Sequence, residues 1–246
     1  MSLMVVISGL FICAKTDTKT STKKEKKANP GYKYIYPARS LSEDVSFADE
    51  PIPVNDPRID HKLKRSLIKT RYSRTETRIL VREAAKLFPI IEPILEHYGI
   101  PNDFKYMPLV EAGLKSGVSR SGAAGWWQFM PGTARTYGLK VGHGKDERYN
   151  IRKATVAACK YLNELYGEFN SWTLAAAAYN NGVVQLAKAI RNQSEDNYFR
   201  LHLNPETGAY VYRIIAMKQI IENAQDFGYK YLCTTDLQPK ELMVYN

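Results

Sequence analysis

The stretch NIRKATVAACKYLNELYGEFNSWTLAAAAYNNG, residues 150–182, decides the fold. Asn150 is a helix-capping residue type, and the apolar side chains after it share one face at helical spacing, namely Ala154, Ala158, Tyr161, Leu162 and Leu165. Ser171 is a second capping residue, and the alanines at 175–178 suit close helix–helix contact because their side chains are small. The stretch therefore predicts two consecutive helices that pack closely.

Helix signals continue on both sides of this pair. Ser73 and Glu76 form a capping box, and Pro89 is expected in the first turn of a separate helix that Gly99 ends. Three more helix starts are predicted, at Asn102, at Pro131 (a helix closed by Gly138) and at Asn204-Pro205. Alternating β patterns are nearly absent, so the predicted fold class is all-α.

The predicted organisation is one main domain with appendages, as expected for 246 residues. A compact helical domain is expected over residues 75–232, with a helical lead-in over 55–74 and a C-terminal tail over 233–246. Residues 15–54 are predicted to be a basic, low-complexity linker.

The first 14 residues are predicted to be an export signal. Residues 4–14, MVVISGLFICA, have the length of a signal-peptide apolar region and are too short to span a bilayer comfortably. Cleavage after Ala14 is one processing route, and lipidation of Cys13 in a loose lipobox, LFIC, is the other. The body would be periplasmic in either case, and membrane-anchored in the second.

Composition excludes several classes of protein. The chain is 44% hydrophobic and has no apolar run of about 18 residues, which excludes a polytopic membrane protein. Three cysteines without a CxxC pair exclude a disulfide framework and a zinc ribbon, and four scattered histidines without HExxH argue against metal-dependent hydrolysis. Cys159 is expected to be a buried free thiol, with pairing to Cys233 as the alternative.

The net charge of +10 favours a polyanionic partner, but much of it is local. Residues 15–30 hold six lysines, Asp17 and Glu25, and so contribute +4 in one short tract. A solvated tail explains this tract more simply than a binding groove. Nucleic-acid binding rests on net charge alone and is not expected.

Glu111 is the candidate catalytic residue. It ends the apolar segment MPLV and precedes Ala112-Gly113, a break in the helix. A carboxyl group at the mouth of an apolar helix end can have a raised pKa and serve as a general acid. A solvated helix-terminal glutamate is the alternative interpretation.

Two further segments contain the residue types that are typical of a sugar-binding cleft. SRSGAAGWWQFMPGTARTYG, residues 119–138, combines hydroxyl groups, small residues, two tryptophans and a glutamine. AAYNNG, residues 177–182, ends an alanine-rich helix with a tyrosine and two amides. Taken separately, the tryptophans can be core residues and Asn181-Gly182 a plain helix end.

In this order, the segments resemble family 1 lytic transglycosylases, whose soluble-lytic-transglycosylase (SLT) domain has a goose-type lysozyme-like fold. The resemblance is strongest to the membrane-bound type D group. GIPNDFKYMPLVEAGL, residues 99–114, is similar to that group's G-x-P-x-D-x-x-Y-x-x-L-V-E-S segment, and NPETGAYVYRIIA, residues 204–216, to its late P-E-T-x-x-Y-V motif. The resemblance covers about residues 55–225.

The resemblance implies a role for each matching residue. Glu111 corresponds to the family's catalytic acid. The implied substrate-binding residues are Ser119, Ser121, Trp127, Gln128, Met130, Tyr179, Asn180 and Tyr210. The implied partner is the peptidoglycan strand, bound by a monomer without a metal or cofactor. The sequence departs from the family at Ala112, usually serine, and at Asn181, usually alanine or serine, and no LysM repeat follows residue 232.

The count of acids predicts the reaction type. Glycosidases commonly use two carboxyl groups, whereas the motifs around Glu111 supply no second one. Glu111 can protonate the glycosidic oxygen and then accept the proton of the N-acetylmuramyl C6 hydroxyl, which attacks C1 of the same sugar and leaves a 1,6-anhydro end. Asp146 and Glu147 are expected to form structural ion pairs.

Two alternatives remain open at this point. A hydrolytic muramidase on the same fold would need Asp146 or Glu147 beside Glu111. A wall-binding protein with a degenerate site is the second, and Ala112 lends it slight support.

Overall fold

The computed structural model describes residues 45–70, 74–113, 117–142 and 144–223. Its α-helices are α1 (Pro57–Lys69), α2 (Arg74–His97), α3 (Met107–Ala112), α4 (Pro131–Thr136), α5 (Ile151–Phe169), α6 (Trp172–Asn181), α7 (Val183–Gln193) and α8 (Thr207–Glu222). The described residues also form two 3-10 helices, η1 (Asn102–Tyr106) and η2 (Glu147–Tyr149). Four short strands pair into two antiparallel ribbons, β1 (Ser46–Phe47) with β2 (Glu50–Pro51), and β3 (Val141–Gly142) with β4 (Lys145–Asp146). The predicted all-α class is confirmed.

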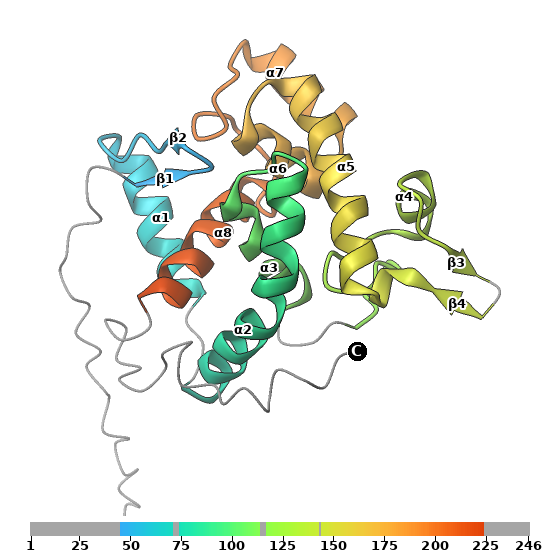
Figure 1. The fold of residues 1–246 in the computed structure, drawn as a ribbon. Coiled ribbons are helices and arrows are strands. Elements are labelled where there is room, and N and C mark those ends of the chain that lie inside the picture. The colour runs from blue at the N-terminus through green and yellow to red at the C-terminus, as the bar shows by residue number, and fades with distance from the viewer. Residues whose placement is uncertain (1–44, 71–73, 114–116, 143, 224–246) are drawn as a thin grey trace, which may run out of the picture. The chain divides into compact units, whose positions relative to one another are not determined.

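The α5–α6 pair forms as predicted. Asn150 caps α5 by accepting a hydrogen bond from the backbone N–H of Lys153 at 3.0 Å, and Ser171 caps α6 by accepting one from Leu174 at 3.3 Å. The alanines at 175–178 have no exposed surface, and α6 packs against α5, α7 and α8 (Figure 1). Their small side chains place α6 in the centre of the helical body.

Helix α8 is the second buried helix of the core. Val211, Ile214 and Ile215 have no exposed surface, and the helix packs against α1, α3 and α6 (Figure 1). Asn204 does start this region, because its Oδ1 accepts hydrogen bonds from the backbone N–H groups of Glu206 and Thr207. The α-helix itself begins at Thr207.

The predicted break at Pro89 is wrong, because α2 runs through both Pro89 and Pro93. The buried side chains Leu80, Val81, Ala84, Leu87, Ile91 and Leu95 form one continuous face across the prolines. A proline inside a helix costs about 3 kcal/mol, and burying a single leucine or isoleucine gains about 1.5–3 kcal/mol. Both prolines are exposed, so water can bond the carbonyl groups that they leave without a donor.

The helix start predicted at Asn102 also differs in detail. Residues 102–106 form the 3-10 helix η1, whose N-cap is Pro101, and the α-helix begins at Met107. Pro131 starts α4 as predicted.

The linker predicted over residues 15–54 is too long at its C-terminal end, because residues 45–54 pack on the helical body. Phe47 is fully buried, and its ring lies 5.3 Å from that of Phe104. The Glu50 carboxylate accepts hydrogen bonds from the backbone N–H groups of Trp172 and Thr173 in the first turn of α6. An acidic group is favoured there by the helix dipole and by unpaired N–H groups.

Several predictions fall outside the described residues. They are the export signal with Cys13, the capping residue Ser73, the tail over 233–246 and Cys233. Within the described part of the chain, no helix is both long enough and apolar enough to cross a membrane.

Candidate active site

Glu111 lies at the C-terminal end of the short helix α3. Met107, Leu109 and Val110 of this helix are buried, whereas Glu111 is half-buried. Gly113 then ends the helix with φ at +59°, a backbone conformation that glycine adopts without strain. The apolar segment thus anchors the helix and presents one carboxyl group at its end.

The surroundings of Glu111 favour its protonated form. Burial is the main cause of a raised pKa, and the carboxylate of Glu206 adds to it by charge repulsion. Two groups oppose this effect, namely the hydroxyl of Tyr210, which donates a hydrogen bond to Oε1 of Glu111, and the positive charge of Arg213. The pKa of Glu111 is therefore raised, which is the direction that the sequence predicts.

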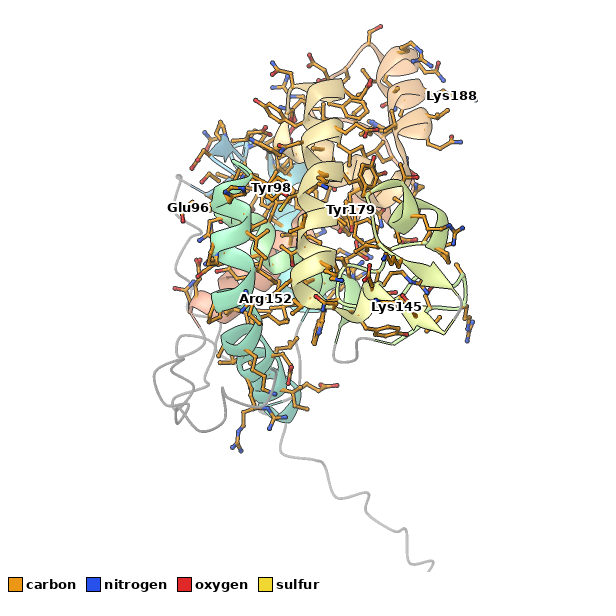
Figure 2. The ribbon with its side chains drawn as sticks, turned by 45° about the vertical axis from the view of Figure 1, so that its right-hand side comes forward. Glu96, Tyr98, Lys145, Arg152, Tyr179 and Lys188 are labelled. Atoms are coloured by element: carbon orange, nitrogen blue, oxygen red, sulfur yellow. The ribbon has the colours of Figure 1, made fainter. Side chains whose placement is uncertain are left out.

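Tyr210 and Tyr179 keep their phenol protons beside this carboxyl group. Burial raises the pKa of both tyrosines well above the usual value, and the Glu111 charge raises it further. Tyr179 lies in the interior next to α5 in Figure 2, where its hydroxyl donates to the backbone oxygen of Trp127 at 2.8 Å. Its ring centroid lies 6.0 Å from that of Phe129 and 5.2 Å from that of Tyr161.

Trp127 does not line a cleft, contrary to its implied role. Its side chain has no exposed surface, and its indole N–H donates to Oγ1 of Thr155 at 3.0 Å. The residue acts through its backbone oxygen, which accepts the hydrogen bond from Tyr179. Trp126 is half-buried and Met130 is 43% exposed, so these two remain available to a ligand.

Gln128 holds the loop of residues 117–130 together. Its side-chain amide donates to the backbone oxygens of Gly117 at 3.0 Å and Gly125 at 2.8 Å. Ser119 and Ser121 are exposed on this loop, and Oγ of Ser119 accepts a hydrogen bond from the backbone N–H of Ala123 at 3.0 Å. The two serines are thus displayed on a loop whose shape Gln128 maintains.

Gly125 of this loop passes against the η2 segment. A Cβ atom at Gly125 would lie 2.0 Å from the backbone oxygen of Arg148, which is a severe clash. The Arg148 guanidinium in turn donates to the backbone oxygens of Gly122 at 2.7 Å and Phe129 at 2.9 Å. Gly125 is therefore required for the close packing of this loop against the η2 segment.

Asp146 and Glu147 are structural, as predicted. Asp146 pairs with the Arg148 guanidinium at 2.7 Å, and Glu147 pairs with Nζ of Lys153 at 2.6 Å. The hydrogen bonds in these pairs lower the pKa of Asp146, and lower that of Glu147 to about 2. Both carboxylates are thus engaged in ion pairs instead of serving as partners of Glu111.

Asn180 belongs to a polar network at the start of α8. Its Oδ1 accepts a hydrogen bond from Thr207 at 2.9 Å, and its Nδ2 donates to the Glu206 carboxylate at 3.3 Å. Asn181, the departure from the family pattern, joins the same network by accepting a hydrogen bond from Asn204 at 3.0 Å. The network connects the end of α6 to the start of α8.

Sequence reasoning missed Glu206 and Arg213. Both affect the charge of Glu111, and they lie 95 and 102 positions after it. Glu206 lies in the segment NPETG, which was quoted because it contains the motif with Tyr210. The carboxylate in that segment was the only sign in the sequence that Glu206 could act near Glu111. Arg213 lies three residues after Tyr210, one helical turn further along α8.

Cys159 is a buried free thiol, as expected. It lies on α5 with no exposed surface, and burial raises its pKa to about 12. At neutral pH such a thiol is protonated and a poor nucleophile.

Comparison with known proteins adds two findings. Residues 94–201 match the family described as Transglycosylase SLT domain. The chain is also 35% identical over 144 residues to proteins named membrane-bound lytic murein transglycosylase D, from Escherichia coli strain K12 and from Escherichia coli O6:H1. Each alignment covers 56% of this chain and 31% of the relative. Together with the helical architecture, these matches support the lysozyme-like fold class.

Proposed function

Starting from the SLT transglycosylase domain in residues 94–201, we propose that this protein is a peptidoglycan lytic transglycosylase. It cleaves the MurNAc-β-1,4-GlcNAc bond without water, leaves 1,6-anhydro-MurNAc ends and serves cell-wall turnover. The observation that carries the proposal is the carboxyl group of Glu111, whose pKa is raised by burial and which accepts a hydrogen bond from Tyr210. The relatives named as lytic murein transglycosylases support the same reaction.

The first half of the reaction is a proton transfer from Glu111. The proton goes to the glycosidic oxygen as the bond between that oxygen and C1 of MurNAc breaks, and GlcNAc leaves with a free 4-hydroxyl group. Transfer by a positioned acid is typically worth about 10²–10⁴ in rate. Positive charge on Arg213 and the Tyr210 hydrogen bond stabilise the carboxylate that results.

The second half returns the proton. The C6 hydroxyl of the same MurNAc attacks C1 and gives its proton to the Glu111 carboxylate, so the enzyme regains its starting state and no water is consumed. An internal nucleophile in the right position can lower a barrier by about 7–11 kcal/mol. A second catalytic carboxylate is therefore not required.

The remaining site residues are proposed either to bind sugar or to support the residues that do. Ser119, Ser121 and Met130 are exposed on the loop that Gln128 supports. Asn180 and Tyr179 hold the end of α6 near Glu111, and Trp127 supports Tyr179 from inside the core. No cofactor enters this scheme.

Digestion of purified peptidoglycan in ¹⁸O-labelled water tests the reaction type. Mass spectrometry should find unlabelled muramyl ends that are lighter by one water than reducing ends. A hydrolase would add solvent oxygen at C1, and mainly ¹⁸O-labelled reducing ends would overturn the proposal. In that case Glu206 becomes the candidate second carboxylate, because it is the carboxylate that affects the Glu111 charge.

Export and anchoring are proposed from residues 1–14 and from the relatives described as membrane-bound. Lipidation of Cys13 would tether a monomeric, periplasmic enzyme beside the wall. The Cys13→Ser variant, expressed in a Gram-negative host, should move from the membrane fraction to the soluble periplasmic fraction. Equal membrane association of both forms would contradict a lipid anchor at Cys13.

A further inference from the structure

A cavity of about 640 Å³ lies between α1, α8 and the segment of residues 201–205. Helix α1 contributes Lys62, Arg65 and Lys69 to its lining, and α8 contributes Tyr212 and Arg213. No residue of α1 belongs to the site described above, and the whole helix precedes the part of the chain that matches the SLT family. The Glu111 site therefore does not account for this cavity.

The cavity is strongly basic. Lys62, Arg65 and Lys69 follow one another at intervals of three and four residues, so they share one face of α1. None of the described residues that line the cavity is an aspartate or glutamate. These three side chains are exposed, and within the described part of the chain they form no ion pair. A basic concavity without internal counter-charges favours an anionic occupant.

The cavity reaches the residue that precedes Glu111 in the chain, although Glu111 itself is not part of its lining. Val110, the residue before Glu111, lines it, and the Arg213 guanidinium donates to the backbone oxygen of Val110 at 3.2 Å. Arg213 thus lines the cavity while its charge acts on Glu111. Arg213 is therefore the residue that connects the lining of the cavity to Glu111.

One polar group of the lining also lacks a partner. The Tyr212 hydroxyl is buried and has no hydrogen-bond partner among the described residues. An unpaired buried polar group costs about 1–3 kcal/mol. This oxygen has no exposed surface in the structure, so the case for an anionic occupant depends on the basic side chains and not on Tyr212.

We propose that this cavity binds the carboxylates of the peptide stem that peptidoglycan carries on its muramyl sugar. The inference rests on the proposed function and deepens it. The stem leaves the lactyl group of the sugar whose C1–O bond lies at Glu111, so the peptide must run past the residues next to Glu111. Its free carboxylates match the charges of Lys62, Arg65, Lys69 and Arg213. The enzyme thereby prefers peptide-bearing strands over bare glycan.

A binding experiment tests the cavity without catalysis. The probe is a synthetic L-Ala–γ-D-Glu–diaminopimelate tripeptide. The control peptide, called the amidated twin below, has the same sequence with all of its carboxylates amidated. Titration calorimetry on the full chain should detect the acidic peptide but not the twin, with affinity falling as salt rises. The triple variant Lys62→Gln, Arg65→Gln, Lys69→Gln should bind at least tenfold more weakly.

The matched control changes the same residue types elsewhere. Lys160→Gln, Lys188→Gln, Arg191→Gln removes three exposed charges from α5 and α7, and Figure 2 shows Lys188 at the outer edge of the body. Equal peptide binding by the two triple variants overturns the proposal, as does equal affinity for the amidated twin. Inorganic phosphate that binds as tightly as the peptide would assign the cavity to phosphate groups and also overturn it.

A cleavage experiment separates this inference from the proposed function. Wild type should cleave peptide-bearing strands with a lower KM than strands stripped by an amidase, and the α1 triple variant should lose that difference while kcat stays unchanged. If wild type cleaves both strands with the same KM, the peptide site is overturned and the transglycosylase assignment stands. If wild type cleaves neither, the function is overturned, whereas peptide binding still reports on the cavity.

Discussion

The Tyr210 hydroxyl donates a hydrogen bond to the Glu111 carboxyl group from a helix 99 residues further along the chain. Tyr210 is buried in α8, the helix that packs against α3, so its position is fixed by the core. A donor to a carboxylate favours the ionised form and lowers the pKa, whereas burial of Glu111 raises it and prevails. The pair therefore holds an acid that can lose its proton and recover it.

Tyr210→Phe should shift the pH dependence of cleavage upward. The variant loses the donor that stabilises the Glu111 carboxylate, so the pKa of Glu111 rises further and the falling limb of kcat/KM moves to higher pH. A lost hydrogen bond of this kind costs about 1–3 kcal/mol, or about 5- to 160-fold in kcat/KM at the optimum. The pH profile on soluble glycan strands is the measurement, and an unmoved falling limb would contradict the pairing.

Glu206→Gln should shift the same limb in the opposite direction. Repulsion from the Glu206 carboxylate helps to raise the pKa of Glu111, so its removal lowers that pKa. Glutamine keeps the oxygen that accepts the Asn180 hydrogen bond. Glu96→Gln is the control, because Glu96 is exposed at the end of α2 (Figure 2) and makes the same charge change. Identical profiles for the two variants would rule out a role for Glu206.

Glu111→Gln should abolish cleavage without weakening the fold. Since the folded state raises the pKa of Glu111, its protonated form contributes stability that is present below the ordinary glutamate pKa and is lost as pH rises through the raised value. Glutamine does not titrate, so the variant should gain in Tm relative to wild type across that pH range. Thermal unfolding at several pH values checks this, and a constant Tm difference would mean that the Glu111 pKa is not raised.

The sequence predicted the parts of the fold that are local in the chain. Asn150, Ser171 and the alanines at 175–178 act within one or two helical turns, where capping and spacing decide the outcome. The errors have long-range causes. Pro89 lies inside α2 because the apolar face on the far side of that helix is buried by other elements, and no local rule reports that burial.

The errors at the site have the same origin. Trp127 matched a cleft motif, but its indole fills the core against Thr155, 28 residues away. Glu206 comes near Glu111 only because α8 packs against α3. A motif identifies which residues matter, whereas tertiary packing decides whether each one faces ligand, core or another charge.

Gln128→Ala should weaken substrate binding more than it weakens the fold. The variant loses both bonds that connect Gly117 to Gly125, so the loop that displays Ser119 and Ser121 is no longer held. Gln128 has a φ of +46°, a backbone conformation that is about as unfavourable for alanine as for glutamine. The variant therefore reports the loss of the side-chain hydrogen bonds and not a change in backbone strain. KM should rise about 5- to 160-fold, in line with about 1–3 kcal/mol. A lower Tm with an unchanged KM would make Gln128 purely structural.

Glu50→Ala should destabilise the helical body although it lies far from Glu111 in the chain. The carboxylate accepts hydrogen bonds from two backbone N–H groups and from the Ser171 and Thr173 hydroxyls at the start of α6. Hydrogen bonds to a charged group are worth about 1.5–3 kcal/mol each, and bonds that share one carboxylate do not add, so a loss of about 2–4 kcal/mol in unfolding free energy is expected. Urea unfolding measures it, with Glu96→Ala as the exposed control. If the urea midpoint of Glu50→Ala equals that of the control, the contacts of residues 45–54 do not stabilise the helical body, and the segment behaves as the linker that the sequence predicted.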